Sequence, residues 1–311
     1  MKSWIVRVLV IVVAMFGALV VASCGDDITG PDPVVDVEAR LFDAMNRDDY
    51  ASAGDFVGEL WELHDKDPEN HRTTFLLGAT ALWWLGEVAR PETVNGLQVV
   101  AQAIPLILES FFDVILNDDR NGPGASGLLG AFLFETGFDR AQGSALVDSA
   151  AKYVPEVGFF QQMHIRRFAA ADDTVTANAI EAGFKFWEYC AGVPVDRDNP
   201  DFTDLVRLPT EAMPEGFCWG SPRVPHGFEG SWLITGDLLV KGGHLGAAKR
   251  AYLNARLGVN YDRWKHKDEL ESRLSEDLEA RYATYLNRNP DLWAPVGLPP
   301  FSCTQCHASK F

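Results

Sequence analysis

The chain has 311 residues, and its 44 acidic residues against 27 Lys and Arg give a formal net charge of −17. So large a negative charge argues against nucleic acid and anionic lipid surfaces as partners; it suits a cationic partner protein, or serves solubility alone. With 47% hydrophobic residues and nine tryptophans, the chain can bury a sizeable core in one extended or two compact domains, which excludes general disorder.

The first residues have the features of an export signal. A basic start precedes an apolar run from Val8 to Val21, and small residues then lead to Cys24. The run Val21-Ala22-Ser23-Cys24 resembles the lipobox of bacterial lipoproteins. In that family the signal peptide, here residues 1–23, is cleaved and the cysteine is lipidated. The alternatives are an uncleaved membrane helix and a plain secretory signal.

This resemblance implies an exported protein whose only membrane contact is the lipid on Cys24, facing the periplasm or the cell surface. Residues 24–36 form a turn-rich acidic stretch, typical of a flexible tether. In Gram-negative lipoproteins an Asp after the lipidated cysteine resembles an inner-membrane retention signal. Gly25 stands there instead, which favours the outer membrane.

Residues 37–190 show helical periodicity, and no stretch alternates as a strand would. The apolar run from Val94 to Leu116 is interrupted by polar residues and Pro105, which favours a buried helix over a membrane span. The Gly-rich run 122–137 lacks the Gly-Lys-Ser/Thr ending of a phosphate loop, so close helix packing explains it better. The region therefore predicts an array of helical hairpins.

The clearest repeat unit lies within residues 230–289. Its large and small residues alternate at fixed positions: Trp232, Gly236, Leu239, Gly243, Leu245, Ala248, Tyr252 and Ala255. The spacing resembles a tetratricopeptide repeat, in which small residues let two antiparallel helices approach closely. Asn260 stands where that family has a proline. A strongly charged helix with a solvated face is expected from Tyr261 to Leu286.

Residues 191–229 interrupt the array with a Pro-rich segment that has few helix formers. Cys190 and Cys218 lie 28 residues apart around it, and in an oxidising compartment they are candidates for a disulfide. Two buried free thiols are the alternative. The predicted fold class is thus all-α: a helical-hairpin, tetratricopeptide-like solenoid with an irregular Pro-rich insertion and an extended C-terminal tail.

The tail, residues 290–311, is Pro-rich and contains Cys303-Thr304-Gln305-Cys306-His307. Random order with 5 Cys and 7 His would give about 0.002 such strings. The C-x-x-C-H run resembles the attachment motif of c-type cytochromes, in which two thiols bond the haem vinyl groups and the histidine ligates the iron. The resemblance covers these five residues only. It implies one covalent haem c, whose pocket must come from the helical body, the insertion or a partner.

Other uses of the motif remain open. A zinc site would need a matched second half, and a redox disulfide would need a strand–helix context; the sequence shows neither. A sixth iron ligand could come from five residues: Met163, Met213, His164, His226 and His244. We favour His226, because Pro225-His226-Gly227 places it in a constrained turn, although a vacant sixth position is equally compatible.

These patterns predict a lipid-anchored helical-repeat protein that carries one haem and passes electrons between membrane-associated partners, its repeat body docking a redox partner. The alternative is a non-redox tetratricopeptide scaffold lipoprotein that binds a protein or solute and has structural cysteines. Haem catalysis at an open iron is a third hypothesis. No other catalytic motif is visible, so a carrier or scaffold is favoured over an enzyme.

Overall fold

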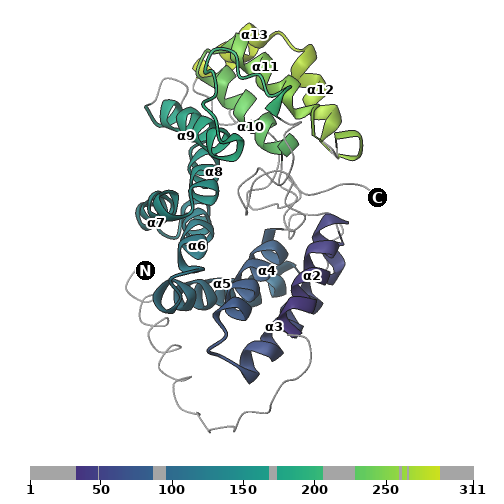
Figure 1. Ribbon diagram of the computed structural model, residues 1–311, viewed down its shortest axis with the longest axis vertical. Helices are drawn as coiled ribbons and strands as arrows, with labels where there is room; N and C mark the ends of the chain where they lie inside the picture. The colour runs from purple at the N-terminus through teal and green to yellow at the C-terminus, as the bar shows by residue number, and fades with distance from the viewer. Residues whose placement is uncertain are drawn as a thin grey trace. The chain divides into compact units, whose positions relative to one another are not determined.

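The computed structural model describes residues 33–287, apart from residue 48 and the ranges 87–95, 168–173, 206–227, 259–260 and 265. Within these residues the regular elements are helices, which confirms the all-α class (Figure 1). The α-helices are α2 (Pro33–Asn46), α3 (Ala53–Lys66), α4 (His71–Gly86), α5 (Gly96–Asn117), α6 (Gly122–Thr136), α7 (Arg140–Tyr153), α8 (Pro155–Arg166), α9 (Thr174–Ala191), α10 (Phe228–Lys241), α11 (Leu245–Ala255), α12 (Lys267–Ser275) and α13 (Leu278–Leu286).

Helices that follow one another in the sequence pack against each other from α3 to α9, as an array of helical hairpins requires. One buried hydrophobic cluster is formed by residues of helices α2 to α6 and includes Leu60, Leu77, Phe111 and Phe132. Gly78 lets α4 and α5 approach closely, since a Cβ there would lie 2.9 Å from the Phe111 ring. Small residues therefore set the spacing of these helices.

Judged by length and composition alone, helix α5 is long and apolar enough to cross a membrane. In the array it packs between α4 and α6 and buries Ile107, Phe111 and Val114, as expected for a helix of a solenoid. Its other face is partly apolar, with Leu97 88% and Leu116 78% exposed.

The Gly-rich run predicted to serve close packing forms α6. It begins at Gly122 as a helix, and α6 packs against α7 and α8. A Cβ on Gly130 would lie 2.7 Å from the carbonyl oxygen of Gly143 on α7. The two backbones therefore approach more closely than any larger residue would allow, which confirms the packing role.

The tetratricopeptide-like unit is the hairpin of α10 and α11. Trp232, Ala248 and Tyr252 are fully buried in it. A Cβ on Gly236 would lie 2.2 Å from the Tyr252 ring, and Gly243 turns the chain between the helices with a φ of 80°. The predicted hairpin and its reliance on small residues are confirmed.

The prediction of a single charged helix from Tyr261 to Leu286 is wrong. The segment forms a short 3-10 turn, Tyr261–Arg263, and then the two helices α12 and α13. Asp277 separates these helices, because its side chain accepts hydrogen bonds from the N–H groups of Glu279 and Ala280 at the start of α13.

The charged face of α12 and α13 is also more than a solvated surface, because two of its arginines approach a buried carboxylate. The side chain of Asp237 on α10 is 0% exposed and accepts hydrogen bonds from the Tyr252 hydroxyl at 2.6 Å and from Arg273 Nε at 3.1 Å. Arg281 lies 3.8 Å from the same oxygen. Burial raises the pKa of Asp237, and the two arginines act against that rise. This network fastens α12 and α13 to the α10–α11 hairpin.

Gly236→Ala should lower the free energy of unfolding by about 3 kcal/mol, because the added methyl group would overlap the immobile Tyr252 ring. Gly58→Ala on α3 is the control: nothing lies within 4 Å of its Cβ, so it should raise stability by about 0.5–1 kcal/mol through helix propensity. Urea unfolding followed by circular dichroism measures both. Equal effects of the two variants would contradict the close approach at Gly236.

Asp237→Asn should cost about 2 kcal/mol, since it removes the fully buried counter-charge of Arg273 and Arg281 and leaves them only the more exposed Glu269 and Glu276. Asp268→Asn removes the same charge from an exposed position on α12 and should change stability by less than about 0.5 kcal/mol. Thermal and urea unfolding of the two variants, compared at one ionic strength, tests whether the network holds the last two helices.

Candidate functional site

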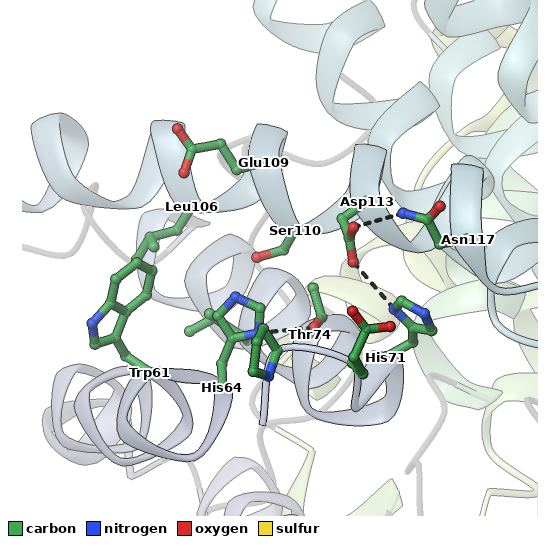
Figure 2. Close-up of a pocket in the computed structure, with 12 residues that line it drawn as sticks. Trp61, His64, His71, Thr74, Leu106, Glu109, Ser110, Asp113 and Asn117 are labelled. Carbon is green, nitrogen blue, oxygen red and sulfur yellow. Dashed lines mark hydrogen bonds and ion pairs between the residues drawn. The ribbon is translucent and has the colours of Figure 1, made fainter. Parts of the chain in front are cut away.

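A pocket of about 600 Å³ lies among α3, α4 and α5 (Figure 2). Its volume falls in the range of sites that hold small ligands. Each helix contributes polar or aromatic side chains to it. Helix α3 supplies Trp61 and His64, α4 supplies His71 and Thr74, and α5 supplies Ser110, Asp113 and Asn117.

Helical spacing brings these side chains to the same place. Residues three, four or seven positions apart lie on one face of a helix, and this spacing relates Trp61 to His64 and His71 to Thr74. Ser110, Asp113 and Asn117 follow the same rule on α5. Figure 2 shows that the α3 side chains face those of α5.

One end of the pocket is held by Asp113, which has partners on both carboxylate oxygens. Its Oδ1 accepts a hydrogen bond from Asn117 Nδ2 at 2.8 Å, and its Oδ2 lies 3.2 Å from His71 Nδ1 (Figure 2). The side chains of His71 and Asp113 remain 22% and 37% exposed. When the His71 Nδ1 carries the proton donated to this carboxylate, its Nε2 is left as a hydrogen-bond acceptor.

The other end is formed by Trp61 and His64, whose ring centroids are 6.0 Å apart. His64 Nδ1 lies 3.0 Å from the Thr74 hydroxyl, which itself donates a long hydrogen bond of 3.4 Å to the Asn70 carbonyl. The Thr74 hydroxyl has a single proton, so which of the two groups donates depends on the tautomer of His64. Trp61 is 45% exposed.

Hydrogen-bond acceptors and negative charge dominate the pocket. Its lining residues include the carboxylates of Glu69, Glu109 and Asp113 but no Lys or Arg. The carboxylates of Glu69 and Glu109 pair with no basic side chain among the described residues. Nor do the described ranges contain three His, Cys, Asp or Glu side chains arranged to hold a metal ion. This chemistry suits recognition of a ligand that donates hydrogen bonds.

Most of the residues that the sequence singled out lie outside the described ranges. These are Cys24, Met213, Cys218, His226, Cys303, Cys306 and His307. The lipid anchor, the haem attachment and the favoured sixth ligand therefore stay predictions.

Cys190 is the described member of the candidate disulfide pair. It is 1% exposed at the end of α9 and takes part in a disulfide bond. Its predicted partner Cys218 lies outside the described residues, so that pairing stays a prediction. Close by in sequence, Trp187 stacks on Trp232 of α10 with ring centroids 4.0 Å apart, which joins α9 to the tetratricopeptide-like hairpin.

Three of the candidate iron ligands are described, and two of them lie in the interior. Met163 is 0% exposed, and its sulfur lies 3.5 Å from the Thr235 hydroxyl. His164 Nε2 lies 2.9 Å from Glu135 Oε1, and burial lowers the pKa of His164. His244 is exposed at the start of α11. The first two therefore serve the packing of α8.

The described part of the Pro-rich insertion, residues 192–205, is irregular as predicted, yet it is firmly attached. Phe202 is 0% exposed and its N–H donates to Asn254 Oδ1 at 3.2 Å. Glu188 on α9 accepts hydrogen bonds from Arg197 and from the Val195 N–H. The Arg197 guanidinium lowers the pKa of Glu188, despite the opposing effect of partial burial.

The pocket residues were missed by the sequence analysis, although a signal for them existed. Asp113 is one of the polar residues that interrupt the apolar run from Val94 to Leu116. Together with Ser110 and Asn117 it forms a polar stripe at helical spacing on an otherwise apolar helix, and such a stripe facing neighbouring helices indicates a polar site. The histidines of α3 and α4 carried no comparable pattern.

Comparison with known proteins gives no family for this chain: no protein-family model, curated protein or solved structure matches it.

The ion pair of Glu188 and Arg197 should make the free energy of unfolding depend on pH in the acidic range. Because the pKa of Glu188 is lowered from its ordinary 4.5, the pair stabilises the fold above that pH, and its contribution is lost as pH falls through the lowered value. Glu188→Gln should therefore flatten the decline in unfolding free energy between about pH 5 and 3. Glu62→Gln on exposed α3 surface should leave the decline unchanged; equal slopes in both variants would contradict the role of Glu188.

Proposed function

We propose that the protein carries one covalent haem c on Cys303 and Cys306, with His307 as an iron ligand, and that it transfers electrons at a bacterial membrane to which Cys24 anchors it. The observation that carries this proposal is the C-x-x-C-H run. The donor set fits the group, because the motif supplies two thiols for the vinyl groups and an adjacent imidazole for the iron. Bound there, the haem would supply a one-electron redox couple.

The all-α body fits the part of a scaffold in this function. Its helices are held by buried aromatic side chains and by the Asp237 network, so it can present a haem and a partner-docking surface without large rearrangement. The net charge of −17 favours a cationic redox partner through electrostatic steering.

Met163 and His164 are weaker candidates for the sixth iron ligand, because both lie in the interior and make other contacts. His226 remains our proposed ligand, with Met213, exposed His244 or a vacant position as the alternatives. A filled position suits electron transfer, since a six-coordinate iron needs little reorganisation, whereas a vacant one would favour haem catalysis.

Expression of the full chain with the periplasmic cytochrome c maturation machinery should give a covalent mass increase of one haem and a sharp α-band on reduction. Cys306→Ser should abolish normal attachment while helical content stays unchanged, because the helical body does not need the haem. Gln305→Ala, inside the same motif, is the control and should retain the haem. Mass spectrometry and visible spectroscopy measure these outcomes.

Wild-type protein that gains neither the mass nor the α-band would contradict the proposal and favour the scaffold alternative. A collapse of helicity in Cys306→Ser would assign the motif a structural role. With haem bound, a low-spin spectrum that becomes high-spin in His226→Ala identifies the sixth ligand.

A further inference from the structure

We propose that the pocket among α3, α4 and α5 binds a small organic cation that carries amine or ammonium groups. This site is separate from the C-x-x-C-H motif, and the proposal does not depend on haem attachment. It rests on the charge, the hydrogen-bonding groups and the exposed indole that line a pocket of about 600 Å³.

The negative charge of the pocket lining favours a positively charged ligand. Glu69, Glu109 and Asp113 line the pocket, and no Lys or Arg does. Within the concave wall of a protein, such a group of carboxylates attracts cations and repels anions more strongly than on a flat surface exposed to bulk water. A carboxylate or phosphate ligand would meet no Lys or Arg in the lining, whereas an ammonium group would meet the Asp113 carboxylate, with the exposed Glu69 and Glu109 also in the lining.

The hydrogen-bonding groups of the pocket favour a ligand that donates hydrogen bonds. The Asp113 carboxylate accepts a hydrogen bond from His71 Nδ1, and in that tautomer the neutral His71 ring has its Nε2 as an acceptor. Ser110 is only 5% exposed, and its hydroxyl has no hydrogen-bond partner among the described residues (Figure 2). This hydroxyl lines the pocket, so it can form a hydrogen bond with a ligand there.

Trp61 supplies a surface for the cation itself. Its side chain is 45% exposed although it lines the pocket, and its indole is the strongest cation–π partner among the aromatic side chains. Figure 2 places it at the opposite end of the pocket from Asp113. A ligand with two amino groups on a short alkyl chain would thus meet an aromatic face at one end and a carboxylate at the other.

The carboxylate of Asp113 is already oriented before any ligand arrives. Asn117 holds one oxygen and His71 the other, so binding need not immobilise the side chain. Gly78 lets α5 lie close to α4 at this point, since a Cβ there would be 3.0 Å from Ser110 Cβ. The site is therefore preorganised by helix packing.

Isothermal titration calorimetry of the full-length protein with 1,4-diaminobutane tests the proposal in 150 mM salt. We expect saturable binding at one site, and no heat of binding with succinate, which has the same carbon chain length and the opposite charge. Cys306→Ser protein should bind 1,4-diaminobutane as the wild type does. Succinate binding of similar affinity, or no saturable binding of the diamine, would overturn the proposal.

Variants then locate the site. Asp113→Asn should weaken binding roughly tenfold, since a charged hydrogen bond is replaced by a neutral one. Trp61→Ala, at an exposed position that folding tolerates, should weaken it about threefold through loss of the cation–π contact. Glu62→Gln removes the same charge as Asp113→Asn but lies outside the lining, so it should leave affinity within about twofold.

Equal losses in Asp113→Asn and Glu62→Gln would show that the cation responds only to the overall charge, which would overturn the assigned pocket. Unchanged binding in both Trp61→Ala and Asp113→Asn would have the same meaning. Circular dichroism of each variant confirms that its helical content matches the wild type before titration.

Discussion

The close approach of successive helices is the constraint on which the structure depends. At Gly78, Gly130 and Gly236 a side chain as small as a methyl group would overlap a neighbouring helix. These glycines lose more conformational entropy on folding than other residues do, and they weaken isolated helices. Packing recovers that loss, because the helices can then bury large aromatic side chains such as Phe111 and Tyr252 between them. The array is stable only as a packed whole.

Polar groups placed inside this array have two different roles. Asp237 is fully buried and surrounded by basic and hydroxyl partners, so it joins the last helices to the hairpin before them. Asp113 is partly exposed, and its partners orient it toward a pocket while leaving its charge uncompensated by Lys or Arg. The difference lies in the counter-charge: two arginines face Asp237, which stabilises the fold, whereas Asp113 has only His71 beside it and is the carboxylate proposed to meet a cation.

The two proposed activities use different parts of the chain. The haem would be held by residues of the C-x-x-C-H run, whereas the cation would be held by three neighbouring helices. Each has its own variants and its own measurement, so success or failure of one leaves the other intact. Both are compatible with the acidic composition of the chain, which attracts cationic molecules.

The sequence by itself determined the all-α class, the α10–α11 hairpin and the packing role of the Gly-rich run, because helical periodicity and small-residue spacing are local patterns. The C-x-x-C-H run, on which the haem proposal rests, is a local pattern as well. Only the tertiary structure decided that α12 and α13 are separate helices around Asp277, that Arg273 and Arg281 serve a buried carboxylate, and that Trp61, His71 and Asp113 share one pocket. Those relations join residues far apart in the chain, and no periodicity within one helix reveals which neighbour its polar face will meet.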